Sequence, residues 1–125
     1  MGLFNKTVEK EVIANFEAKY NDVKENILNV VKNKLSENSF TIFRVHLIID
    51  EPEVLCNFLD IENSNIVSPY DLTSNSRISI NSLSSLFIKS FEPFLTDLGL
   101  KVINSKTEYN AYSESDCKIY FKIIK

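Results

Sequence analysis

The chain has 125 residues, of which 44% are hydrophobic and 25% are charged, a composition typical of one soluble globular domain with a substantial core. Its formal net charge of −3 argues against a protein that coats nucleic acid, since that task needs a cationic surplus. No apolar run approaches the roughly 20 residues of a membrane span and no secretory signal is recognisable, so we expect a cytoplasmic protein with reduced cysteines.

The first predicted element is a long amphipathic helix from Thr7 to about Leu35, and residues 1–6 before it are expected to be flexible. Its apolar residues recur at alternating spacings of three and four, like the seam of a coiled coil. We expect this stripe to cover a sheet. The alternative is a homodimer in which the helix pairs with a second copy through Ile13, Phe16, Tyr20 and Val23.

The next element, residues 40–49, is a β-branched and aromatic run without Gly or Pro, which predicts a strand. Every second side chain is apolar or Thr, whereas the other set is mixed and includes Arg44 and His46. This alternation predicts one face covered by helices and one face in contact with solvent.

Residues 52–59 predict a short helix, because Asp50 is suited to the N-cap and Pro52 to the first turn. Residues 60–76 then lose all periodicity and are rich in Asn, Ser and Pro. They predict a long polar loop, with residues 66–67 as a brief edge strand. A long loop in a small domain is often functional, so this is a first place to expect a partner contact.

Residues 77–80 alternate between polar and apolar and predict a short strand. A second amphipathic helix follows, with Asn81 or Ser82 as its N-cap and Gly99 as its left-handed C-terminal residue. Pro93 lies within this helix and is expected to kink it or divide it in two.

Residues 100–103 and 117–124 predict two further strands, paired as an antiparallel hairpin with a polar connection. Together the elements predict an α+β fold in a single domain spanning residues 1–125. A long N-terminal helix and a second helix are expected to pack on one face of a mostly antiparallel sheet of about four strands.

The strand alternation places several cations on the sheet face opposite the predicted helices, with Tyr120 flanked by Lys118 and Lys122. Such a face suits an acidic partner or, as an alternative, a single-stranded nucleic acid. The ordinary alternative is a solvated face whose cations deter unwanted strand pairing. The predicted partner-binding residues are Arg44, His46, Tyr70, Arg77, Tyr120 and Lys122.

Signals for catalysis, metals and cofactors are weak. His46 is the only histidine, which removes most metal sites, and glycines are present only at positions 2 and 99, which argues against phosphate-binding loops. We therefore expect no catalytic residues, no metal and no cofactor. The enzyme alternative depends on His46, assisted by Cys117 or by an Asp from a loop.

These observations predict a small soluble non-enzymatic binding protein, of the adaptor, inhibitor or immunity type, that acts through protein–protein contacts. The abundance of Asn, Ile, Ser and Lys favours an AT-rich coding sequence, as in phages and other mobile elements of low-GC bacteria. The partner is expected to be another protein, with nucleic acid as the less favoured alternative and no membrane.

The order of helix, strands, helix and strands in an acidic chain of this size resembles class I type III secretion chaperones. Those proteins are dimeric and bind unfolded effector segments, so the resemblance implies a dimer that binds a segment of a partner. The predicted elements lack the closing C-terminal helix of that family.

Overall fold

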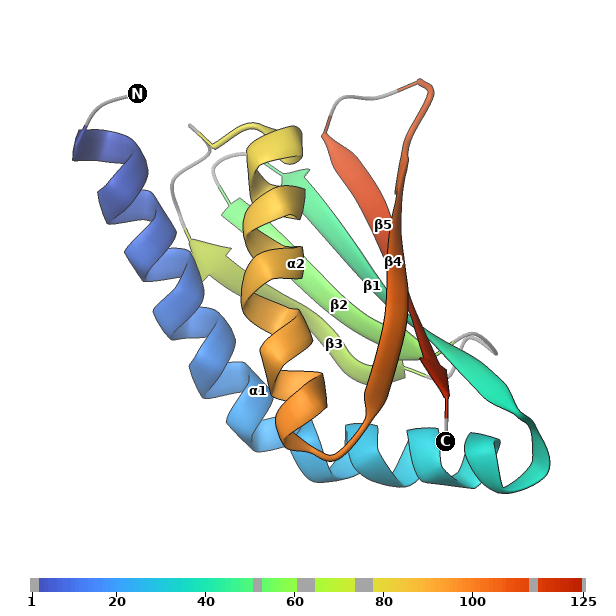
Figure 1. Cartoon of the computed structure of the whole chain (residues 1–125). Coiled ribbons are helices and arrows are strands. Elements are labelled where there is room, and N and C mark those ends of the chain that lie inside the picture. Colours follow the sequence, from blue (N-terminus) through green and yellow to red (C-terminus); the bar gives the residue numbers. More distant parts are fainter. Residues whose placement is uncertain (1–2, 51–52, 61–64, 74–77, 113–114, 125) are drawn as a thin grey trace.

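Two helices and five strands make up the computed structural model, which describes residues 3–50, 53–60, 65–73, 78–112 and 115–124. In chain order they are α1 (Leu3–Glu37), β1 (Phe40–Asp50), β2 (Glu53–Asp60), β3 (Asn65–Thr73), α2 (Ile80–Asp97), β4 (Lys101–Tyr109) and β5 (Asp116–Ile124). Figure 1 shows both helices on one side of the sheet. The predicted α+β class is therefore confirmed.

The five strands form a single sheet in the order β3-β2-β1-β5-β4, and every neighbouring pair is antiparallel. The strand that follows the first helix, β1, lies at the centre, with Val45 in register with Phe58 of β2 and Ile119 of β5. The predicted hairpin of the last two strands is confirmed as β4 and β5. The edges of the sheet are β3 and β4.

The predicted alternation along β1 is confirmed, because Phe43, Val45 and Leu47 are buried while the side chains between them are only half-buried. The same alternation recurs along β5, where Cys117, Ile119, Phe121 and Ile123 are buried. The buried sets of both strands face the helices and form the floor of the core.

Helix α1 is longer than predicted at both ends and covers more than one part of the sheet. Figure 1 shows it changing direction, so that its first half runs beside β3 and its last turns cross the end of the sheet near β1. Its buried residues follow mostly at every fourth position: Val8, Val12, Phe16, Tyr20, Val23, Ile27, Val31 and Leu35.

Aromatic rings join the two helices to the sheet. The ring of Phe16 lies 4.5 Å from that of Phe87, Tyr20 lies 4.5 Å from Phe94, and Phe91 lies 5.4 Å from Phe121 on β5. Such ring pairs contribute about 0.5–1.5 kcal/mol each beyond the area that they bury.

The segment predicted as a short helix at residues 52–59 is instead β2, so that prediction is wrong. Val54 and Cys56 are fully buried whereas Leu55 and Asn57 are half-buried, an alternation typical of a strand. Pairing with the central strand β1 outweighs the local helix-start signal of the preceding residues.

The edge strand predicted at residues 66–67 is present but longer, since β3 spans Asn65–Thr73, and the prediction of a loop is therefore wrong over the middle of residues 60–76. Pro69 is accommodated there because an edge strand can leave one side of a residue without a ladder hydrogen bond. Residues 61–64 and 74–77 lie outside the described residues.

The strand predicted at residues 77–80 is wrong for the described residues 78–80. Ser79 is the N-cap of α2, and its hydroxyl oxygen accepts a hydrogen bond from the Ser82 amide at 3.1 Å, so the cap lies earlier than Asn81 or Ser82. Ile78 and Ile80 are buried as predicted, but they pack at the start of a helix.

Helix α2 continues through Pro93 as one element, which excludes the predicted division into two helices. Gly99 has a φ of +82° directly after the C-cap Leu98, as predicted for a left-handed terminating residue. Neither α1 nor α2 has the apolar length needed to cross a membrane, within the residues that the structure describes.

Candidate functional site

The face of the sheet opposite α1 and α2 is not covered by any described helix, and we refer to it as the open face. It is defined by nine residues from the three adjacent strands β1, β5 and β4: Ile42, Arg44, His46, Lys118, Tyr120, Lys122, Asn104, Lys106 and Glu108. The residues from β1 and β5 are half-buried and those from β4 are exposed, so solvent reaches this surface most freely along β4.

Strand register brings cations and apolar side chains together on this face. Arg44 is in register with Tyr120, and Ile42 with Lys122, while Lys106 of β4 is in register with Tyr120 from the other side. The Nζ atom of Lys122 lies 4.5 Å from the centre of the Phe40 ring, a cation–π contact that contributes about 0.5–1 kcal/mol at an exposed site.

A hollow of about 260 Å³ lies in the middle of the open face, with Ile42, Asn104, Lys106, Glu108, Tyr120 and Lys122 around it. Its charged groups are two ammoniums and one carboxylate, next to a phenol and an aliphatic side chain. This combination suits a partner side chain that has both an apolar part and a negative charge and that inserts into the hollow.

His46 forms the most specific polar contact near this face. Its Nε2 lies 2.9 Å from Oδ2 of Asp116, and each side chain is about one-fifth exposed. The hydrogen bond from His46 is the main reason that the pKa of Asp116 lies below its usual value. The Asn110 amide, which donates to Asp116 Oδ1 at 3.0 Å, and the positive charge of Lys118 act in the same direction.

This contact connects the central strand to the β4–β5 turn. The amide oxygen of Asn110 accepts a hydrogen bond from the Tyr112 backbone N–H at 2.9 Å, so the histidine, the carboxylate and the turn form one network. The network explains how an isolated histidine on a strand is satisfied.

The assisting cysteine of the enzyme alternative does not meet His46. Cys117 faces the helices, is 1% exposed, and has a pKa raised to about 12 by burial and by the neighbouring charge of Asp116. A thiol with this pKa is a poor nucleophile at neutral pH. No group of three or more potential metal ligands occurs among the described side chains.

The structure brings four of the predicted binding residues onto the open face, namely Arg44, His46, Tyr120 and Lys122. Tyr70 lies in β3, where its backbone is in register with Cys56, and its side chain is outside the described part of the structure. Arg77 lies outside the described residues altogether.

Most of the residues predicted to pair α1 with a second copy are instead buried within the chain. Phe16, Tyr20 and Val23 are buried in the chain's own core and Ile13 is half-buried, while the Tyr20 hydroxyl donates to the Phe94 carbonyl oxygen at 2.8 Å. These three buried side chains are not available to a second copy without unpacking the helix.

The sequence patterns did not predict the contribution of β4 or the role of Asp116. A strand that ends at Ile103 leaves Lys106 and Glu108 in the polar connection, whereas β4 continues to Tyr109. The register irregularity between Val102 and Asn104 explains why the sequence alternation is interrupted there. The alternation of Lys106, Thr107 and Glu108 was the available signal for a longer strand.

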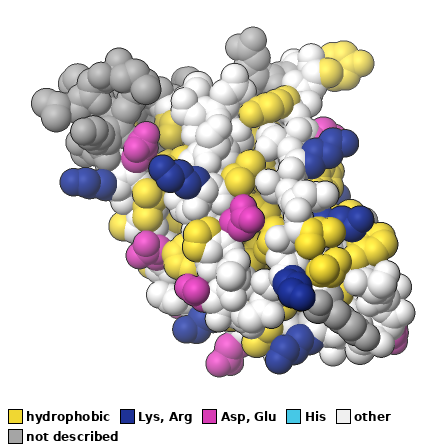
Figure 2. All heavy atoms as spheres, in the orientation of Figure 1, with side chains coloured by type: hydrophobic (Ala, Val, Ile, Leu, Met, Phe, Trp, Pro, Cys, Tyr) yellow, Lys and Arg dark blue, Asp and Glu magenta, His cyan; other side chains and the backbone are white. Residues whose placement is uncertain are grey.

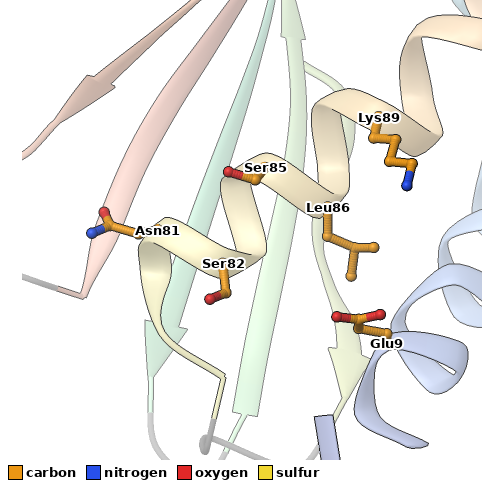
Figure 3. Close-up of a pocket in the computed structure, with 6 residues that line it drawn as sticks. All are labelled: Glu9, Asn81, Ser82, Ser85, Leu86 and Lys89. Atoms are coloured by element: carbon orange, nitrogen blue, oxygen red, sulfur yellow. The ribbon is translucent and has the colours of Figure 1, made fainter. Parts of the chain in front are cut away.

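A second hollow, of about 400 Å³, lies between the N-terminal part of α1 and the first half of α2 (Figure 3). Glu9 comes from α1, and the other five residues come from α2: Asn81, Ser82, Ser85, Leu86 and Lys89. Apart from the half-buried Leu86, these side chains are exposed and are typical of the solvated surface of two helices.

Figure 2 shows the face that carries the helices, where acidic and basic side chains are interspersed. The open face has four cations, Arg44, Lys106, Lys118 and Lys122, and one carboxylate, Glu108, while Asp116 continues the same side of β5 beside Lys118. Comparisons of the chain with protein-family models, with curated proteins and with solved structures find no match.

Proposed function

We propose that this chain is a non-enzymatic binding protein that uses the open face of its sheet to bind an acidic surface of another protein. The observation that supports this most directly is the cluster of Arg44, Lys118 and Lys122 around Tyr120 in a chain whose net charge is −3. A local positive surface on an acidic protein orients a negatively charged partner and raises its association rate.

The sheet also gives this surface the rigidity that binding requires. Its three strands are held by antiparallel pairing, and the opposite sides of β1 and β5 are packed against the core, so the side chains of these two strands on the open face start from defined positions. Less conformational freedom is then lost on binding than on a loop. Adaptor and inhibitor proteins both act by occupying a partner in this way.

The test is affinity capture from a lysate of the source organism, with and without nuclease, using three forms of the chain. The face variant is Lys118→Glu/Lys122→Glu, and the matched control is Lys24→Glu/Lys89→Glu, which makes the same charge change on exposed positions of the helices. We expect wild type and control to retain the same protein after nuclease treatment. The face variant should retain about tenfold less, because reversal repels an acidic surface.

Equal retention of the partner by the face variant would contradict use of the open face. Recovery of nucleic acid alone would instead support the second candidate, in which bases stack on Tyr120 between cations. That outcome predicts a steep loss of binding as salt concentration rises.

A further inference from the structure

Strand β4 is a long edge of the sheet, and no other described strand pairs with its outer side. Helix α1 packs against the other edge strand, β3, and α2 contacts β4, but β4 ends the strand order and pairs only with β5 among the described strands. All side chains of β4 except those of Val102 and Thr107 are exposed, and Ile103 and Tyr109 are 50% and 47% exposed. An edge of this length is a template for another strand.

The hydrogen bonding of the hairpin determines which backbone groups of β4 face outward. The Asn110 amide donates to the Asp116 carbonyl oxygen at 3.4 Å, so these two residues form a hydrogen-bonded pair. Hydrogen-bonded pairs alternate along an antiparallel ladder, and Glu108 and Lys106 therefore share their backbone bonds with β5. The backbone groups of Ser105, Thr107 and Tyr109 point away from β5, toward the free edge.

A second copy of the same chain fits this edge in one register better than in its neighbours. With a two-fold axis at Thr107, Thr107 pairs with its own copy and Ser105 pairs with Tyr109, so that all the outward-facing backbone groups meet one another. Lys106 of each copy then lies directly opposite Glu108 of the other. These are non-hydrogen-bonded positions, where cross-strand side chains approach most closely.

The neighbouring registers are unfavourable. An axis at residue 106 places Lys106 opposite its own copy, and an axis at residue 108 does the same for Glu108. Like charges directly opposite on paired strands are destabilising. A lysine on an edge strand ordinarily deters pairing, but here the carboxylate two residues away makes the edge complementary to itself in the Thr107 register.

We propose that two copies of this chain associate through β4, antiparallel to each other and with the two-fold axis at Thr107. The two sheets then form one continuous sheet and the two open faces lie on the same side of it. The Tyr109 hydroxyl, 2.9 Å from the Ser84 hydroxyl of α2, keeps that ring on the helix side, away from the Lys106–Glu108 pairs. The proposal does not depend on the proposed function, because it rests on the edge of the sheet.

The test is sedimentation velocity of the full chain over a range of micromolar concentrations, on wild type, Lys106→Glu and Glu108→Lys. We expect a dimer for wild type and an at least about tenfold higher dissociation constant for each variant, since one substitution makes both symmetric pairs repulsive. An equimolar mixture of the two variants should dimerise again, because a chain with two carboxylates at these positions then faces a chain with two ammoniums. Lys89→Glu is the matched control and should dimerise like wild type.

A further variant tests which backbone N–H groups of β4 point toward the free edge. Thr107→Pro removes an outward-facing N–H without removing a bond to β5, so it should abolish the dimer while the far-ultraviolet circular dichroism spectrum stays unchanged. A wild-type chain that remains monomeric at all concentrations would overturn the proposal. A dimer that persists in the single variants, or variants whose mixture does not dimerise, would also overturn it.

Discussion

At the residue scale, the contact between His46 and Asp116 shows what a single sequence can and cannot reveal. The alternation along residues 40–49 predicts that His46 lies on the uncovered side of the sheet, and the structure confirms this. Its partner Asp116 lies 70 positions away and belongs to a group of acidic residues without periodicity. Only the register between β1 and β5 brings the two together, and no local pattern encodes that register.

This contact makes the stability of the chain depend on pH. Because the pKa of Asp116 is lowered in the folded chain, its contribution to the free energy of unfolding is present above the unfolded pKa of about 3.8 and is lost as pH falls through the folded pKa. We expect Asp116→Asn to destabilise the chain by about 1 kcal/mol at pH 7, and the difference from wild type to disappear in strong acid.

Urea unfolding of wild type and Asp116→Asn at several pH values measures this difference. Asp22→Asn, at an exposed position of α1, is the matched control and should leave stability nearly unchanged. A difference between wild type and Asp116→Asn that stayed constant down to strongly acidic pH would show that the carboxylate charge has no part in it.

At the element scale, long and regular hydrophobic patterns predict the observed helices and strands, whereas short or irregular patterns do not. Strand β1, both helices and the final hairpin have long or regular alternations, and each of them is present. The failures lie at β2 and β3, where Pro52, Pro69 and neighbouring polar residues favour turns and helix starts locally. Pairing of β2 with β1, and of β3 with β2, supplies the energy that overrides those local preferences. A pattern read within a single segment does not contain this contribution.

Pro93 gives a prediction at the same scale. It lies on the exposed side of α2, in a helix that continues past it, and its ring nitrogen has no hydrogen to donate to the carbonyl group four residues earlier. Pro93→Ala should therefore raise the free energy of unfolding by about 1–3 kcal/mol, because it restores a backbone donor and relieves the contact with the preceding turn.

Thermal and urea unfolding check this expectation. Thr96→Ala in the same exposed last part of α2 is the matched control and should change stability by less than about 1 kcal/mol, since the gain in helix propensity is offset by loss of the exposed hydrogen bond from the Thr96 hydroxyl to the Glu92 carbonyl oxygen. If Pro93→Ala proved less stable than wild type, the proline ring would have to make a stabilising contact of its own.

At the scale of the whole molecule, the two helices lie on one side of the sheet and leave two surfaces of it uncovered. One is the open face, where cations surround Tyr120, and the other is the outer edge of β4. Sequence patterns predicted the first surface in outline, since strand alternation alone separates the two faces of a sheet. They did not predict the second, because the order of strands in the sheet decides which one lies at an edge.

Zero-length cross-linking of the captured complex can show whether the open face contacts an acidic protein surface, as we propose. A carbodiimide activates a carboxylate, a lysine amine already in contact with it displaces the urea to form an amide, and mass spectrometry then identifies the joined residues. We predict links from Lys118 and Lys122 to Asp or Glu residues of the partner, and none from the exposed Lys24 and Lys89 on the helices. Links confined to the helix lysines would contradict the account.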